Sequence, residues 1–334
     1  MRWRCARRRI CWADRRDFPG GLALTQRIVV FGATGDQGRA QVEALVRAGH
    51  HPVAISRGGD AAPVDGMAVE AVGVDLSDEA ASEAAIRAAL GGADVVFLNL
   101  PSTSFQAAEP LIAATRTIAD AAAKAGVGVI VFNTSLPVPD DKRGFAAQDA
   151  RHDMRSILFS GEVPAISLEP VVFLDNLLKG WAWPSIAERG VLAYPHRAEL
   201  EVSWICHADL AQLMIAAAKR PDLSGRHFAV GGAETVRLEQ LAAILSQAWD
   251  ADLAVENQSI DTFVGNMGAV FEGKSTLDAE RMMGELKRIY EWYNFSPEQP
   301  FKVDMSGVLQ ELPVTLTPIA EWARAQRLPS PIRG

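Results

Sequence analysis

A short apolar strand that runs into three closely spaced glycines most limits the fold of this chain. Residues 27–50 read RIVVFGATGDQGRAQVEALVRAGH, in which an expected strand over 28–32 leads into Gly32, Gly35 and Gly38. Glycines at such a junction permit a tight turn, the approach of a pyrophosphate to the backbone, and close packing of the following helix on the strand. Free N–H groups at the start of that helix attract anions. The segment therefore predicts a dinucleotide-binding βαβ unit, and a turn that holds no ligand is the alternative.

Strand and helix patterns alternate through the first half of the chain. Short, continuous apolar runs are typical of strands in a parallel sheet that is covered on both faces. Such strands are expected at residues 28–32, 52–56, 68–74, 94–100, 127–133 and 164–168. Helices are expected between them, at residues 38–48, 79–90 and 106–125, and glycines follow each one. The predicted fold class is α/β, a doubly wound parallel sheet of the Rossmann type.

The pattern loosens after about residue 170, where aromatic residues become frequent. Trp181, Trp183 and Tyr194 follow in turn, and one helix-like stretch over 276–293 stands out within segment 255–313. Aromatic side chains at such spacing belong to a core or line an apolar pocket. We therefore expect a disordered extension, an NAD(P)-binding Rossmann domain, and a smaller, mainly substrate-binding C-terminal region with elements that return to the Rossmann core. Their predicted ranges are 1–26, 27–170 and 171–334.

The first 26 residues differ sharply in charge from the rest of the chain. Residues 1–26 carry seven Arg and two Asp, a net charge of +5, whereas residues 27–334 carry a net charge of −13. The stretch GGLALTQ is too short and too broken for the apolar core of a secretory signal. A disordered, arginine-rich extension is therefore expected, with a nucleic-acid-binding arm as the alternative, and the acidic body is not expected to bind nucleic acid.

Composition also limits the location and the partners of the protein. No stretch approaches the ~20 apolar residues that span a bilayer. Cys5 and Cys11 lie in the extension, which leaves Cys206 alone in the body. One cysteine makes neither a disulfide framework nor a metal cluster, so the expected location is the cytoplasm. The expected partner is a small-molecule substrate, without nucleic acid, membrane or metal, and a homodimer is left open.

The end of the second expected strand indicates which nicotinamide cofactor the chain prefers. NAD sites usually place a carboxylate there to accept from the ribose 2′-OH, but this chain has Ser56 and Arg57. An arginine fork matches a 2′-phosphate. Asp60 lies three residues further along, in the loop RGGD, and is the alternative acid. NADP(H) is therefore the preferred cofactor, with NAD(H) as the second candidate.

Motifs in both halves of the chain carry a family resemblance. GATGDQG, ISR and VDLSD lie in the first half, and EPVVFLDNLL, WICHADLAQLMIAAA, RHFAVGGAETVRLEQLAAIL and ELPVTLTPIAEWARAQR follow in the second. In this order they resemble the NmrA-like and isoflavone-reductase-like group of atypical short-chain dehydrogenases/reductases, over residues 27–328. The resemblance implies cofactor contacts at the phosphates, the adenosine end and the nicotinamide side. The matching residues are Gly32, Thr34, Gly35, Asp36, Gln37 and Gly38; Ser56, Arg57, Asp75 and Leu76; and Leu100, Pro101, Asn133, Thr134, Ser135 and Phe173.

The catalytic pattern departs from that of ordinary short-chain dehydrogenases. None of the three tyrosines has a lysine four residues later, so the Tyr-x-x-x-Lys motif is absent. The isoflavone-reductase branch that the chain resembles uses a lysine thirteen residues before an Ile-Pro or Val-Pro, and counting back from Pro164 places Arg151 there. Arginine stays protonated at neutral pH. Arg151 is therefore expected to orient a ribose or a substrate oxyanion rather than to act as a base.

Two further side chains complete the predicted catalytic set of Arg151, His152 and Ser135. His152 can exchange protons near pH 7, with a partly exposed helix histidine as the alternative. Ser135 can donate to a substrate carbonyl, with a loop-capping hydroxyl as the alternative. Lys142, in the loop PDDKRG, is expected to be solvated, with a swing into the site as the alternative. A structural role is expected for His207, and nothing in the sequence positions His196, which could face the substrate.

Two functions from different classes follow from this pattern. The first is an NADPH-dependent oxidoreductase that reduces a small, apolar or aromatic substrate by hydride transfer. The second is an NADP(H)-binding redox sensor or regulator without turnover, which the missing Tyr-x-x-x-Lys motif and family lysine favour. Oxidation of NADPH in the presence of a carbonyl or enone library distinguishes the two.

Overall fold

A computed structural model describes residues 25–76, 79–273 and 275–332. Residues 1–24 lie outside the described residues, and the disordered extension stays a prediction. Gln26, at the end of that predicted extension, belongs to the folded part, because its carbonyl oxygen accepts a hydrogen bond from the His51 N–H at 2.9 Å.

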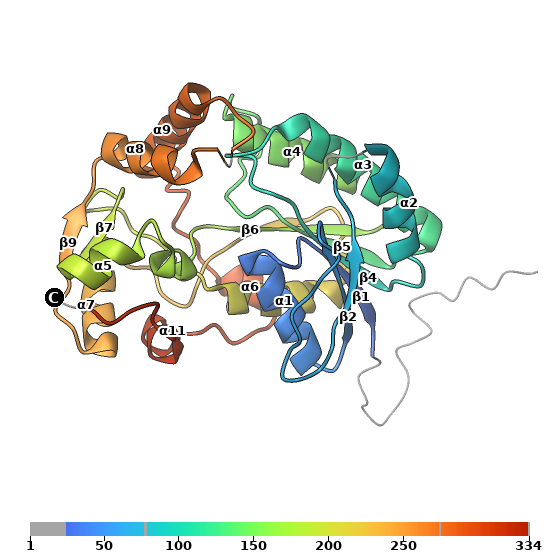
Figure 1. Cartoon of the computed structure of the whole chain (residues 1–334), viewed down its shortest axis with the longest axis horizontal. Helices are drawn as coiled ribbons and strands as arrows, with labels where there is room; N and C mark the ends of the chain where they lie inside the picture. The colour runs from blue at the N-terminus through green and yellow to red at the C-terminus, as the bar shows by residue number, and fades with distance from the viewer. Residues whose placement is uncertain (1–24, 77–78, 274, 333–334) are drawn as a thin grey trace, which may run out of the picture.

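A seven-stranded sheet forms the centre of the molecule (Figure 1). Its strands are β1 (Arg27–Phe31), β2 (His51–Ser56), β3 (Glu70–Gly73), β4 (Val95–Asn99), β5 (Val129–Asn133), β6 (Ala165–Pro170) and β8 (His227–Val230). Their order is β3-β2-β1-β4-β5-β6-β8, and each neighbouring pair is parallel. The strand order reverses between β1 and β4, the kind of switch point at which open α/β sheets bind ligands. The predicted doubly wound sheet is confirmed.

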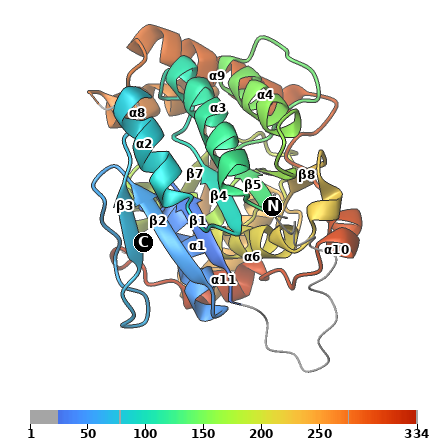
Figure 2. The same cartoon turned by 90° about the vertical axis from the view of Figure 1, so that its right-hand side faces the viewer.

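Helices cover both faces of the sheet (Figures 1 and 2). One face carries α1 (Asp36–Arg47) and α6 (His207–Ala218), and the other carries α2 (Glu79–Ala89), α3 (Ala108–Ala125) and α4 (Ala146–Phe159). The three helices expected in the first half are thus present, each starting or ending within about two residues of its predicted range. α3 ends at Gly126, whose φ of +75° is the left-handed conformation that glycine adopts without strain.

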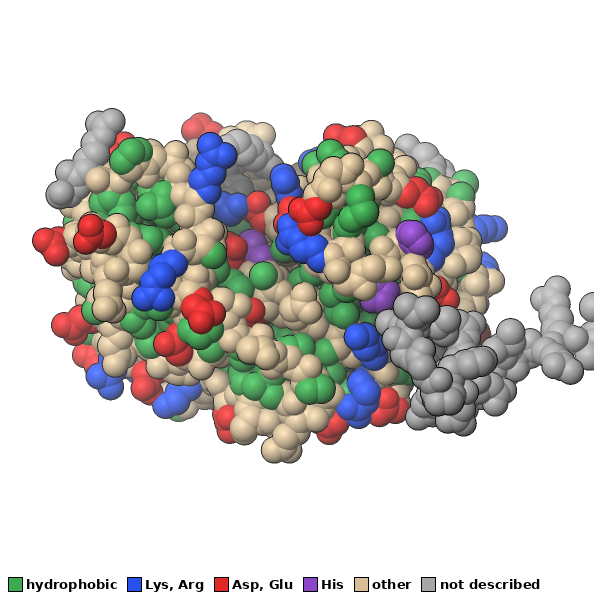
Figure 3. All heavy atoms as spheres, turned by 90° about the horizontal axis from the view of Figure 1, so that it is seen from below, with side chains coloured by type: hydrophobic (Ala, Val, Ile, Leu, Met, Phe, Trp, Pro, Cys, Tyr) green, Lys and Arg blue, Asp and Glu red, His purple; other side chains and the backbone are tan. Residues whose placement is uncertain are grey.

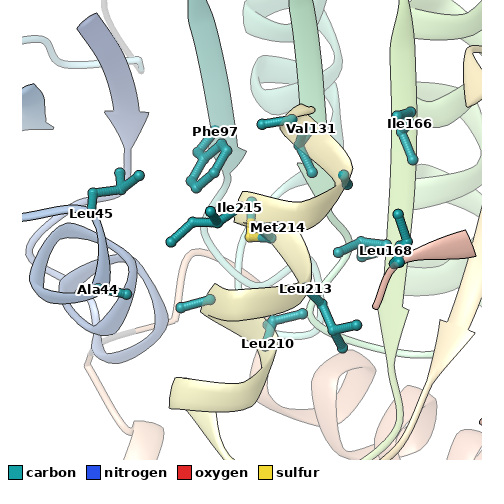
Figure 4. Close-up of a cluster of buried hydrophobic side chains, with 14 of the residues drawn as sticks. Ala44, Leu45, Phe97, Val131, Ile166, Leu168, Leu210, Leu213, Met214 and Ile215 are labelled. Carbon is teal, nitrogen blue, oxygen red and sulfur yellow. The ribbon is translucent and has the colours of Figure 1, made fainter. Parts of the chain in front are cut away.

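Two buried cores lie on the two faces of the sheet, because alternate side chains of a strand point in opposite directions. Phe97 and Val131 face α6, where they meet Leu210 and Met214 (Figure 4). The next residue on β4, Leu98, packs instead with the α2–α4 layer. Strands that are apolar on both faces need this double cover, which is why the predicted strands read as continuous apolar runs.

The C-terminal half adds a smaller layer of helices beside one end of the sheet. Its elements are the 3₁₀ helix η2 (Leu174–Leu178), the strands β7 (Val191–Tyr194) and β9 (Ala254–Asn257), and the helices α5 (Trp183–Arg189), α7 (Leu238–Trp249), α8 (Ile260–Phe271), α9 (Ala279–Phe295) and α11 (Ile319–Ala325). The 3₁₀ helix η3 (Pro221–Leu223) and the helix α10 (Ser306–Glu311) instead pack on the α6 side of the central sheet, where Leu223 and Val308 belong to the same buried core as Leu210. β7 and β9 pair in parallel as a separate two-stranded sheet. By contrast, α6 and β8 belong to the central sheet and its cover, although they also come from the second half of the chain.

The expectation of one helix in segment 255–313 is wrong, because α8 and α10 accompany α9 there. Gly265 and Gly268 lie inside α8, and glycine lowers intrinsic helix propensity. Tertiary packing stabilises this helix instead: Phe263 and Met267 of α8 form a buried cluster with Met282 of α9. Within the described residues, none of the helices is long and apolar enough to cross a membrane.

Candidate functional site

The three glycines after β1 meet different structural needs. Gly32 has a φ of +67°, and a Cβ there would lie 2.8 Å from the Asn99 carbonyl oxygen. A Cβ on Gly38 would lie 2.2 Å from the carbonyl oxygen of Gly32, so the packing of helix on turn excludes a side chain. Gly35 has an extended backbone, and apart from its chain neighbours only the Gly32 carbonyl oxygen, at 3.3 Å, comes within 4 Å of its Cβ position. The fold therefore requires glycine at positions 32 and 38. At Gly35, the space that a ligand needs explains the glycine better than packing does.

The start of α1 opens onto this space. Gly35 is the N-cap residue and no side chain caps the helix, so the first N–H groups stay available to a ligand at the positive end of the helix dipole. The turn is therefore a candidate phosphate cradle. The carboxylate of Asp36, the first residue of α1, lies at the same helix end and repels an anion there.

A chain of amide side chains connects the glycine turn to the ends of β4 and β5. Gln41 and Asn99 pair through two hydrogen bonds, of 2.8 and 2.7 Å. Asn133 donates to Asn99 Oδ1 at 2.8 Å and to Gln37 Oε1 at 2.6 Å. Gln37 Oε1 also accepts from the Ser135 hydroxyl at 3.2 Å. The structure therefore brings the predicted residues Gln37, Asn133 and Ser135 together at one edge of the sheet.

Sequence reasoning missed two members of this network, Gln41 and Asn99. The available signal was an amide within an apolar helix face and another near the end of the apolar strand VVFLN. Buried polar groups need partners, so two unexplained buried amides could have been predicted to pair. Ser135 adds a backbone signal, since it has a φ of +65°, a conformation that costs energy for a residue other than glycine and concentrates at functional sites.

The predicted adenosine side lies at the ends of β2 and β3. Arg57 is exposed, and its guanidinium forms no ion pair with the other described residues. Ser56 instead holds the loop, because its hydroxyl accepts from the Gly59 N–H at 3.1 Å and donates to the Asp60 carbonyl at 3.1 Å. The Asp60 carboxylate lies beside Ser56, at 3.4 Å from its hydroxyl. Asp75 follows β3 and is exposed, and Leu76 is partly buried.

The predicted nicotinamide side is mostly buried. Leu100, Thr134 and Phe173 are 5%, 0% and 4% exposed. Thr134 turns its hydroxyl into the protein, toward the Leu136 carbonyl at 2.7 Å. Pro101 is exposed and Ser135 is partly exposed, so these two are the members of this set that a ligand reaches in the present conformation.

The predicted catalytic residue Arg151 is completely buried. Its guanidinium donates to the carbonyl oxygens of Leu100 at 3.1 Å and Pro101 at 2.7 Å, and burial lowers the Arg151 pKa to about 10. A side chain without accessible surface does not touch a ligand, so direct orientation of a ribose or substrate by Arg151 does not fit this conformation. The contact instead supports the loop that leaves β4.

The other two candidates on α4 and its preceding loop point elsewhere. His152 Nε2 lies 2.9 Å from the Asp140 carbonyl oxygen, so this ring nitrogen donates and the histidine holds the loop before α4. Lys142 forms a surface ion pair with Asp153 at 2.5 Å, as expected for a solvated loop. The catalytic role of His152 stays a prediction.

His207 and His196 both lie inside the protein. The His207 ring packs 4.6 Å from the ring of Phe173, and burial lowers its pKa despite the neighbouring Asp175. His196 is 1% exposed, and burial lowers its pKa to about 3. Its ring lies among Tyr194 and Trp204, with centroids 4.6 and 5.4 Å away. A substrate-facing role for His196 therefore does not fit the structure.

A cavity of about 80 Å³ lies between the loop after β4, the first turns of α3 and α4, and α9. Its lining combines uncharged polar groups, charged groups and apolar surface, supplied by Thr103, Gln106 and Gln148; by Glu109, Arg281 and Glu285; and by Leu286 and Ile289. The same loop begins at Leu100 and Pro101, whose carbonyl oxygens accept hydrogen bonds from Arg151. The cavity therefore lies on the loop that follows the predicted nicotinamide side in the chain, and it is the candidate substrate site.

Comparison with known proteins agrees with this architecture. The model of the NmrA-like family matches residues 24–323. The chain belongs to the NmrA-like family. This NmrA-like protein is 31% identical, over 236 residues, to a (4-alkanoyl-5-oxo-2,5-dihydrofuran-3-yl)methyl phosphate reductase from Streptomyces griseus, and the match covers 70% of this chain and 78% of the relative.

Two solved structures show the fold of the NmrA-like protein. An NADPH-dependent quinone oxidoreductase from Escherichia coli, complexed with NADPH, has a TM-score of 0.63 and 21% identity, covering 89% of this chain and 98% of its own. NmrA, a negative transcriptional regulator complexed with NADP, has a TM-score of 0.66 and 17% identity, covering 90% and 95%. The fold thus occurs in both an oxidoreductase and a regulator.

Proposed function

We propose that this protein is an NADPH-dependent reductase of a small, apolar or aromatic molecule that carries a conjugated carbonyl group. One observation carries the proposal. The candidate phosphate cradle at Gly35 and the cavity beside Thr103 lie at the same carboxyl edge of the sheet. The relative from Streptomyces griseus supports the conjugated carbonyl, since its named substrate contains an unsaturated lactone, alongside a phosphate group.

Several residues of this chain fit NADP(H). The uncapped start of α1 suits the diphosphate. The exposed Arg57 guanidinium, which forms no ion pair with the other described residues, suits the 2′-phosphate. NAD-binding sites usually have a carboxylate at the end of this strand to accept from the ribose 2′-OH, but β2 ends at Ser56 and Arg57 follows it. The bound cofactor would supply a hydride, which is its own chemistry, while the protein orients the ring and shields it from water.

The remaining chemistry falls to side chains at the edge of the cavity. Hydride addition to an electron-poor carbon leaves a negative charge that a proton must quench. Ser135 is partly exposed and its hydroxyl already shares Gln37 Oε1 with Asn133, so it can hydrogen-bond the substrate oxygen while water supplies the proton. Arg151 positions the loop at Pro101 and takes no part in the proton transfer.

The alternative function is a regulator that binds NADP(H) without turnover. The burial of Arg151 and the absence of the Tyr-x-x-x-Lys motif favour it, since the chain lacks a side chain of the kind that usually donates the proton. The neighbour NmrA shows that the fold serves such a role.

The deciding experiment follows NADPH absorbance with a library of quinones, enones, unsaturated lactones and aromatic aldehydes. The proposed function predicts oxidation with at least one class and none by the Gly35→Val variant. Tight NADPH binding by calorimetry, without oxidation across the library, would instead support the regulator.

A further inference from the structure

An ion pair bridges the C-terminal region and the glycine turn. The Lys179 ammonium nitrogen lies 2.7 Å from Asp36 Oδ1. Asp36 is the first residue of α1, whereas Lys179 follows η2 in the segment that leads away from the central sheet. Both side chains remain partly exposed, at 36% for Lys179 and 62% for Asp36. The pair therefore stands beside the phosphate cradle and is open to a ligand.

The surroundings of this pair are acidic. The Asp175 carboxylate accepts from the His207 N–H at 2.9 Å and lies 3.5 Å from His207 Nδ1. Burial lowers the pKa of His207, while the carboxylates of Asp175 and Asp36 raise it and the Lys179 ammonium lowers it. Two carboxylates and the Lys179 ammonium thus set the local charge. Figure 3 shows charged side chains of both signs at a hollow between the central sheet and the C-terminal elements.

Asp36 presents a difficulty for an anionic ligand at the start of α1. A carboxylate within a few ångströms of a diphosphate repels it, and the repulsion is screened only in part at such short range. The helix start and the open space at Gly35 nevertheless favour a phosphate. A cation that neutralises Asp36 and also reaches the ligand reconciles these two observations.

We propose that Lys179 is a cofactor-binding residue, whose ammonium group contacts the diphosphate of NAD(P)H while it stays beside Asp36. An ammonium group has three N–H donors, so it can donate to the carboxylate and to a phosphate oxygen together. The contact joins the glycine turn to the C-terminal region when the cofactor is bound. This inference rests on the proposed function only in taking NAD(P)H as the ligand.

The test measures affinity for NADPH and for NADH by calorimetry, without turnover. Both cofactors share the diphosphate, so Lys179→Met is expected to weaken both by a similar factor of about ten, the size of one charged hydrogen bond. Asp36→Asn is expected to bind both cofactors at least as tightly as the wild type. In the Asp36→Asn background, the loss caused by Lys179→Met is expected to shrink, because the repelling carboxylate is gone.

Lys287→Met is the matched control, because Lys287 of α9 forms a similar surface ion pair, 2.6 Å from Asp261 of α8. This variant is expected to leave both affinities unchanged. Unchanged binding by a folded Lys179→Met variant, or a loss confined to NADPH, would overturn the inference. If Lys179→Met does not fold, Asp36→Asn decides, and weaker binding by that variant counts against the inference. Failure of the wild type to bind either cofactor refutes the proposed function instead.

Discussion

The guanidinium of Arg151 donates to the carbonyl oxygen of Pro101 at 2.7 Å, from a position with no accessible surface. Its other contacts are the Leu100 carbonyl at 3.1 Å and the Met154 sulfur at 3.6 Å, so the buried cation is held by dipoles rather than by an acid. The loop that it supports continues into the wall of the candidate substrate cavity. Arg151 is therefore a positioning residue in this structure.

Replacing Arg151 by Met is expected to lower kcat at least about tenfold, the size of one lost charged hydrogen bond, with a smaller effect on NADPH affinity. The reason is that the two carbonyls lose their donor and the loop at Pro101 moves, while the glycine turn is untouched. Hydrogen exchange should quicken at Phe105 and Gln106, whose N–H groups bond to the Ser102 carbonyl. Wild-type kcat together with wild-type exchange would contradict the positioning role.

Two glycine variants are expected to separate fold from binding. Gly35→Val should fold, because its backbone is extended and its Cβ position has open space on most sides, but the side chain should abolish NADPH binding. Gly38→Val should be destabilised by more than about 3 kcal/mol, since its Cβ would lie 2.2 Å from the Gly32 carbonyl oxygen. Thermal unfolding and calorimetry measure the two effects. NADPH binding by a folded Gly35→Val variant would refute the cradle.

Arg57→Ala is expected to weaken NADPH by about ten- to a hundredfold, which corresponds to roughly 1.5–3 kcal/mol for a charged hydrogen bond. NADH, which lacks the 2′-phosphate, should bind this variant almost as it binds the wild type. High salt should reduce the difference, because Arg57 is exposed. Equal losses for both cofactors would show that Arg57 does not contact the 2′-phosphate.

His196 is expected to make the folded state sensitive to acid. Burial lowers its folded-state pKa to about 3 from an ordinary value of 6.5. Below pH 6.5 the unfolded chain therefore binds a proton that the folded chain does not, so stability falls as the pH drops toward 3. The loss from this residue is at most about 1.4 kcal/mol per pH unit.

The matched variant is His196→Phe, which keeps a ring among Tyr194 and Trp204 but does not titrate. Neither nitrogen of the His196 ring has a hydrogen-bond partner among the described residues, so the substitution removes no bond. Urea unfolding between pH 7 and pH 4 should show a shallower loss of stability in the variant. Parallel pH profiles would mean that His196 gains a proton in the folded protein.

Local patterns were sufficient for the glycine turn and for the central sheet except β8, an edge strand that the expected set did not include. The apolar strands, the helices between them and the residues at Gly32 to Gly38 could be predicted, because periodicity and turn chemistry act over a few neighbouring residues. The same reasoning failed for α8, because its glycines lower helix propensity and packing on α9 stabilises the helix instead. It also failed for β7 and β9, which pair with each other. Such elements depend on partners that are distant in sequence.

The amino-acid sequence by itself determined the doubly wound sheet, the family and the position of the glycine turn, since these follow from short motifs and their order. Only the tertiary structure decided what individual side chains do. It buried Arg151 beneath Pro101, paired Gln41 with Asn99, and brought Lys179 to Asp36 at the start of α1. Spacing along the chain does not encode these contacts, because each joins residues that meet only when separate strands, helices and loops pack together.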